Sequence, residues 1–159
     1  MARYFRRGKS KVIFTPTVAA YNATTGTGSP IRAEITAGTP LTPQIAEVNG
    51  FSFSNSPIPV PDLNSTFTST IAGEDTAEDS GFVFYDDDVA TTIRTALIKG
   101  TKGYILLLPY GDVSTKRAEV WPVESTGIAD EWSAGNDPAR FSVSFGITSP
   151  PSLSATVPV

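Results

Sequence analysis

EDSGFVFYDDDVATTIRTALIKGTKGYILLLPYG, residues 78–111, is the stretch that decides the fold. Its last third contains the most apolar run of the chain, Tyr104 to Leu108, in which five apolar residues follow one another without alternation. Such a run is typical of a strand that is covered on both faces. We therefore expect a helix to cover one face of this strand and a second sheet to cover the other.

The middle of the stretch predicts one helix, over about residues 87–99. Its expected N-terminus carries three acidic residues that can cap the helix and interact favourably with its dipole: Asp86, Asp87 and Asp88. Its apolar residues recur every four positions, at Val89, Ile93 and Leu97. Lys99 and Gly100 suit the last turn and the C-cap. A helix this short is marginal alone, so it must pack on an apolar platform.

Most of the remaining chain predicts strands and loops. Alternating, β-branched or aromatic residues predict strands at 11–15, 31–35, 51–54, 65–71, 118–123 and 141–147. Prolines at positions 57, 59 and 61 indicate an edge strand or an extended crossing. Long polar loops are expected at 21–30 and 127–137. The predicted fold is mainly β, a β-sandwich or flattened barrel with one flanking α-helix and extended N- and C-terminal arms.

The length of 159 residues is most simply one domain with a real core. We expect an N-terminal arm at 1–10, a single β-sandwich domain at 11–148, and a C-terminal tail at 149–159, where Pro150 and Pro151 should end regular structure. The N-terminus is basic but no long apolar region follows, so neither a signal peptide nor a membrane partner is expected.

The net charge of −4 is unevenly distributed along the sequence. Five of the twelve Lys and Arg residues lie in the first eleven positions, and seven of the sixteen acids lie between Glu74 and Asp88. The candidate acidic cluster consists of Glu74, Asp75, Glu78 and Asp79. The candidate inter-subunit arm consists of Arg3, Tyr4, Phe5, Arg6 and Arg7. Arms and long loops on a modest β core favour a subunit that holds its neighbours.

The composition argues against catalysis. The chain has no His and no Cys, which removes the usual hydrolase triad, thiol chemistry and most zinc sites. Gly8-Lys9-Ser10 lacks the earlier glycine and the preceding strand of a phosphate-binding loop. The three aspartates at 86–88 lack the spacing of a calcium loop, so helix capping explains them better. No catalytic residue, cofactor or metal ligand is predicted.

Three alternatives from other functional classes stay open at this point. A monomeric β-sandwich binding module for carbohydrate would need an aromatic platform, and the candidates are Trp121, Trp132 and Tyr110. A glycosidase could use neighbouring acids such as those at 74 and 75 or at 130 and 131, but sequence neighbours do not define a cleft. The basic arm could bind nucleic acid, although the acidic body behind it would repel phosphate.

Several short segments, in their order and spacing, resemble one known family. They are residues 4–8 with Lys11 and Val12, residues 33–39 with Leu41, 50–52, 73–76 with Asp79, 84–87, 93–97 with Gly100, 103–104, 121–123 and 139–141. The chain resembles the major tail (tail tube) protein of long, non-contractile-tailed bacteriophages, in the form common among phages of actinobacteria.

The resemblance implies a tail-tube-like β-sandwich that self-assembles into homohexameric rings, whose stacking forms a tube. It implies as partners a tape-measure protein, a tail terminator and tail-tip proteins. It also implies that DNA transits the lumen without specific binding, and that the protein belongs to the virion tail and is assembled in the bacterial host cytoplasm. Under this interpretation the acidic cluster faces either the lumen or the basic arm of the adjoining ring.

Overall fold

The computed structural model describes residues 5–159, so the candidate arm residues Arg3 and Tyr4 lie outside the described range. Within that range the elements, in chain order, are β1 (Lys11–Thr15), α1 (Arg32–Ala37), β2 (Thr39–Pro40), the 3-10 turn η1 (Thr42–Gln44), β3 (Ile45–Asn49), β4 (Phe53–Val60), β5 (Ser69–Ala77), β6 (Ser80–Tyr85), α2 (Thr92–Ala96), β7 (Lys102–Leu108), β8 (Arg117–Glu131), β9 (Arg140–Ile147) and β10 (Ser152–Thr156).

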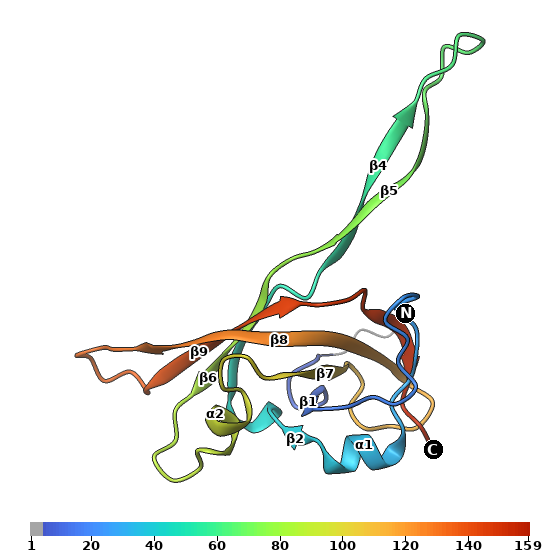
Figure 1. Cartoon of the computed structure of the whole chain (residues 1–159). Helices are drawn as coiled ribbons and strands as arrows, with labels where there is room; N and C mark the ends of the chain where they lie inside the picture. The colour runs from blue at the N-terminus through green and yellow to red at the C-terminus, as the bar shows by residue number, and fades with distance from the viewer. Residues whose placement is uncertain (1–4) are drawn as a thin grey trace.

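The body of the molecule is an antiparallel sheet that folds around a core (Figure 1). Its strand order over residues 5–159 is β2-β1-β7-β8-β9-β6-β3, and β10 also pairs with β8. The long strand β8 pairs with β7 and β10 along its first part and with β9 along its second part. A register shift between Ser125 and Gly127 marks the change, as expected where a strand bends. The mainly β prediction is confirmed.

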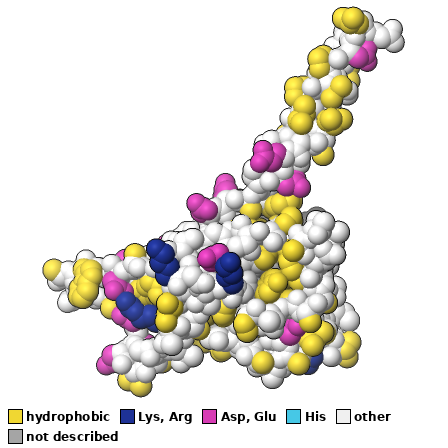
Figure 2. All heavy atoms as spheres, in the orientation of Figure 1, with side chains coloured by type: hydrophobic (Ala, Val, Ile, Leu, Met, Phe, Trp, Pro, Cys, Tyr) yellow, Lys and Arg dark blue, Asp and Glu magenta, His cyan; other side chains and the backbone are white. Residues whose placement is uncertain are grey.

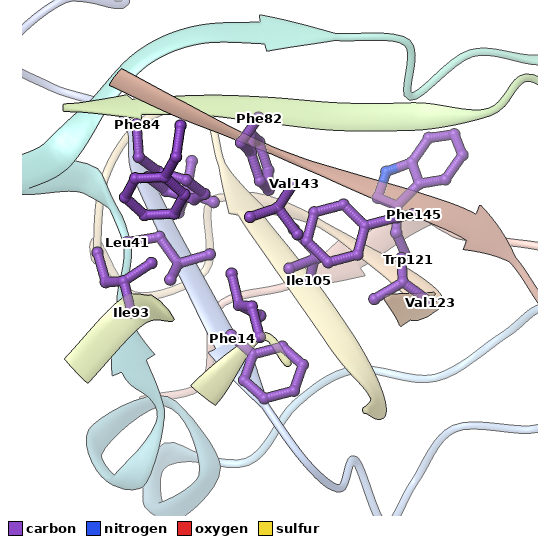
Figure 3. Packing of buried hydrophobic residues seen from close by; sticks show 13 residues of the cluster. Phe14, Leu41, Phe82, Phe84, Ile93, Ile105, Trp121, Val123, Val143 and Phe145 are labelled. Carbon is purple, nitrogen blue, oxygen red and sulfur yellow. The ribbon is translucent and has the colours of Figure 1, made fainter. Parts of the chain in front are cut away.

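Strand β7 is covered on both faces, as its sequence predicts. Ile105 points into one cluster of buried residues, whereas Leu106 and Leu108 point into a second cluster on the opposite face. The first cluster contains the phenylalanines of β6 and β9 and the buried residues of α2 (Figure 3). The second contains Ile35 of α1 and residues of β8 and β10. The predicted arrangement, with a helix on one face and a second sheet on the other, is therefore wrong. Strands β6 and β9 of the same sheet and α2 lie on one face of β7, whereas α1 and β10 lie on the other.

The helix predicted over 87–99 is wrong in its bounds, and so is its capping. The observed α2 covers only Thr92–Ala96, with Thr91 in the N-cap position. Oδ1 of Asp87 instead accepts the N–H groups of Val89 (2.9 Å) and Ala90 (3.0 Å), which closes a turn before the helix begins. Val89 is 86% exposed, so the apolar stripe contains only two buried residues, Ile93 and Leu97.

The strand predicted at 31–35 is also wrong, because this segment forms α1. The carboxylate of Glu34 accepts the N–H of Ile31 (2.9 Å) at the start of the helix and the N–H of Ala19 (2.7 Å) from a distant loop. Only Ile35 is buried, whereas Ile31 is about half exposed. The alternation of apolar and charged residues thus reflects a short helix with one buried side chain. The chain has two α-helices within residues 5–159, not one.

The remaining strand predictions are confirmed in part. The strands predicted at 11–15 and 141–147 are β1 and β9, and 21–30 is a loop apart from an isolated bridge between Asn22 and Thr27. The loop predicted at 127–137 is shorter, because β8 continues to Glu131. Regular structure does not end at Pro150, because β10 follows directly and packs Ala155 into the second cluster.

Candidate assembly surface

Strands β4 and β5 form a hairpin that leaves the body and projects away from it (Figure 1). Within residues 5–159 these two strands pair only with each other. The amide of Asn55 fixes their register: Nδ2 donates to the carbonyl of Gly73 (2.9 Å), and Oδ1 accepts the Gly73 N–H (3.1 Å). Gly73 is required here, since an added Cβ would lie 2.0 Å from the carbonyl oxygen of Ser56. The segment with three prolines is therefore an edge strand, as predicted.

The root of the hairpin is fixed to the core through Phe51. Gly50 and Phe51 both have positive φ, at 76° and 56°, and this turns the chain out of β3. The N–H of Phe51 donates to Oγ of Ser80 (2.8 Å). Its ring lies 5.1 Å from that of Phe82 and 5.5 Å from that of Trp121, between centroids. These contacts hold the hairpin at a defined angle to the body.

The hairpin exposes apolar side chains along its length and at its tip (Figure 2). They are Phe53, Ile58, Val60, Leu63, Phe67 and Ile71. The two at the tip, Leu63 and Phe67, are the most exposed of the set. A contiguous apolar surface of this kind marks an interaction site. Sequence reasoning missed it, although apolar residues between the prolines, in a segment without Lys or Arg, were a usable signal.

The structure brings the four residues of the candidate acidic cluster to the root of this hairpin. Glu74 and Asp75 lie on β5, and Glu78 and Asp79 lie in the connection to β6. All four are exposed, and none forms an ion pair with another residue of the range 5–159. Asp75 accepts a hydrogen bond from Nδ2 of Asn55 (2.6 Å). The acidic cluster thus carries negative charge that has no cationic partner in the described part of the chain.

The described part of the candidate arm is a turn held against the end of β7. The N–H groups of Lys9 and Ser10 donate to the carbonyl of Arg6, and Oγ of Ser10 donates to that of Pro109 (2.9 Å). Phe5 is 87% exposed, and Arg6 and Arg7 are exposed. The guanidinium groups therefore stand at the surface beside β1 and β7.

Arg94, at the other end of the sheet, is already paired. Arg94 of α2 donates to the carboxylate of Asp130 (2.8 Å), lies 3.8 Å from that of Asp86, and stacks over the ring of Phe141. The hydrogen bond from Arg94 holds the pKa of Asp130 below its ordinary value. Backbone donation from Ala90 and Val89 does the same for the pKa of Asp87. These ion pairs and hydrogen bonds stabilise the region around α2, which is far along the chain from the arm.

Trp121 cannot take part in the aromatic platform that a carbohydrate module needs. Trp121 is 1% exposed in the core, whereas Trp132 is 93% exposed at the turn between β8 and β9. Over residues 5–159 no group of three or more acidic side chains is arranged to hold a metal ion. No helix of the described range has the length and apolar character needed to span a membrane.

The sequence matches the family of phage tail tube proteins over residues 1–159. The chain belongs to this family. It is a structural, non-enzymatic tail tube protein and a component of the virion tail, which confirms the broader resemblance found in the sequence. A search of curated proteins gave no match.

Solved structures support the tail tube fold at low sequence identity. The chain is similar to a cryo-EM structure of an extracellular contractile injection system, the PVC sheath/tube terminator in the extended state (TM-score 0.63, 11% identity, covering 93% of this chain and 95% of that one). It is similar to a chain of the 6-fold symmetrised baseplate of the anti-feeding prophage (TM-score 0.59, 7% identity, covering 93% of this chain and 94% of that one). It is also similar to a chain of the tail of an empty GTA particle refined with C6 symmetry (TM-score 0.57, 15% identity, covering 97% of this chain and 100% of that one).

Proposed function

We propose that this tail tube protein assembles into homohexameric rings that stack into the tube of a long, non-contractile phage tail. The observation that carries the proposal is the projecting β4–β5 hairpin, whose apolar side chains have no partner in the described part of the chain. A monomer has no physical reason to hold such a surface in water, whereas a repeating subunit can bury it on its neighbour. Heterologous contacts of this type generate rings and open filaments.

Sixfold symmetry is supported by two of the similar structures, which were solved with C6 or 6-fold averaging. Their identity to this chain is at most 15%, so they bear on the fold, and the hexamer is our proposal for this chain. The non-contractile character rests on the sequence segments that carry the resemblance. Isolated tails should therefore show a naked tube, and a contractile sheath around it would contradict this part of the proposal.

The proposed partners are a tape-measure protein inside the tube, a terminator at one end and tail-tip proteins at the other. Chains with a similar fold occur in a GTA tail, in the terminator of a contractile injection system and in the baseplate of the anti-feeding prophage, which supports contacts of this kind. DNA would pass through the lumen without specific binding. The acidic cluster, with its four exposed carboxylates, suits a conduit that must not retain phosphate.

Negative-stain electron microscopy of the purified, concentrated chain tests the proposal. We expect rings or tubes of uniform diameter. The same measurement is repeated with the tape-measure and initiator proteins, because a tube subunit can wait for them. A chain that stays monomeric in both experiments would overturn the proposed function.

Charge reversal of Glu74, Asp75 and Asp79 tests the role of the acidic cluster separately. Because these side chains are exposed, the variant should fold normally but impair tube growth or DNA passage. Tails of normal length and full infectivity from this variant would show that the cluster has neither role.

A further inference from the structure

A groove of about 420 Å³ lies beside the candidate arm, between the start of β1, the end of β7 and the edge strand β3. Its floor is apolar and includes Ile45, Val48 and Leu107, and Val48 is 49% exposed. Its rim carries three cations, Arg6, Arg7 and Lys11. An apolar floor bordered by charges of one sign is the form of a site that receives an apolar segment of opposite charge.

The charge of this groove is not balanced within the described range. None of the three rim cations forms an ion pair with a residue of the range 5–159. The one acid in the lining, Glu119, already pairs with Arg117 (3.0 Å) and accepts a hydrogen bond from Nε1 of Trp121. The rim therefore presents positive charge that nothing in the described chain compensates.

The hairpin has the complementary properties. Residues 50–79 contain no Lys or Arg but five acids, of which Asp62 lies at the tip, next to Leu63. Figure 2 shows an acidic group near the apolar tip and further acidic groups at the root, with no cation on the hairpin. The hairpin points away from the body that carries it (Figure 1), so the natural recipient is another molecule.

We infer that the groove between the arm and β3 receives the hairpin tip of a second copy of this chain. This inference rests on the proposed self-assembly and assigns its recipient surface. Leu63 and Phe67 of the entering hairpin lie on the apolar floor, and Asp62 faces the arginines of the rim. The repeated unit is thus a hairpin inserted into a groove, which is a heterologous contact.

Disulfide trapping tests this contact, because the chain contains no Cys of its own. Two full-length variants, Leu63→Cys and Val48→Cys, one of them mass-tagged, are mixed and oxidised mildly. The matched control replaces the second variant by Val113→Cys, since Val113 is also 49% exposed but does not line the groove. We expect the tip-to-groove heterodimer to form at least tenfold faster than the control pair.

Equal rates for the two pairs would overturn the inference. The same samples without oxidant are examined by electron microscopy, which separates the two proposals. Tubes together with equal rates would leave the proposed function intact and place the hairpin elsewhere. Fast tip-to-groove trapping in a chain that never assembles, even with its tail partners, would support the contact and reject the tube.

Charge exchange provides the second test. Replacing Arg6 and Arg7 by Glu should slow the trapping about tenfold and reverse its response to salt, because the rim and the acidic tip then repel each other. Adding Asp62→Lys to the entering chain should restore most of the rate. A rate that the rim variant leaves unchanged, or that Asp62→Lys fails to restore, would contradict the proposed pairing of tip and rim.

Discussion

Strand β9 and the β4–β5 hairpin contain apolar side chains of the same kind but use them differently. In β9, Phe141 and Val143 are at most 2% exposed, whereas Ile58 and Ile71 of the hairpin are more than half exposed. The first pair is buried when the chain folds, because β6, β7 and α2 surround it. The second pair has no cover in the described chain. The body therefore carries the stability of the monomer, and the hairpin carries the surface reserved for assembly.

The largest expected effect comes from a truncation in the body. Phe84→Ala removes a fully buried ring that packs on Phe82 and Phe141, and should lower the free energy of unfolding by about 3–5 kcal/mol. The matched hairpin variant, Phe67→Ala, should change it by less than about 0.5 kcal/mol. Urea unfolding of both monomers measures the difference. Similar losses in the two variants would abolish the distinction between the regions.

A next smaller effect is expected on assembly rather than on folding. Phe67→Ser leaves the fold intact but removes apolar area that becomes buried in the contact, at about 2 kcal/mol for one such side chain. The critical concentration for tube growth should then rise by at least about tenfold. Sedimentation of assembled against free protein measures it. Ser144→Ala, on an exposed site of β9, serves as the control and should leave the critical concentration unchanged.

The stability of the connection between the body and the hairpin, at Gly50, should be sensitive to the addition of one methyl group. At Gly50, φ is +76° and an added Cβ would lie 2.7 Å from the carbonyl oxygen of Asp79. Gly50→Ala should therefore lower the free energy of unfolding by about 1–2 kcal/mol. Gly127→Ala is the control, because a Cβ there has open space and no positive φ. Thermal or urea unfolding distinguishes them, and equal midpoints would show that the hairpin root tolerates adjustment.

The smallest expected effect concerns the exposed pair of Arg94 and Asp130. The pKa of Asp130 is lowered in the folded state, so its contribution is present above its unfolded value, near 3.8, and is lost as pH falls through the folded pKa. Asp130→Asn should thus give a slightly lower urea midpoint at neutral pH, and the difference from the original chain should vanish in acid. A difference that persists at low pH would point to a cause other than this ion pair.

The body could be predicted where burial alone decides the pattern. The strict alternation at 141–147 specifies β9, because one face of that strand is covered by the core. α1 could not be predicted, because Glu34 stabilises it partly through the N–H of Ala19, a contact between segments fifteen residues apart. β10 was missed because the two prolines before it suggested an end, although it pairs with β8.

The candidate assembly surface could likewise be predicted from the sequence only in part. The acidic cluster could be found because its members are sequence neighbours on one hairpin arm and its connection. The apolar face of the hairpin was missed, because a period-two pattern normally indicates a covered strand, although the absence of Lys and Arg around these apolar residues was a usable signal. The groove could not be predicted either, because its lining comes from four separate segments, at residues 6–12, 42–48, 107–109 and 119.

The prolines of β4 also matter for the chain before it assembles into a tube. Pro57 and Pro59 have no N–H, so β4 has two fewer donors to offer to an added strand. An edge with fewer donors is a poorer template for the strand of an identical hairpin. Pairing between unassembled chains through this edge of the hairpin is therefore disfavoured. The strand that exposes apolar side chains for assembly thus has an edge that is poorly suited to pairing with another strand.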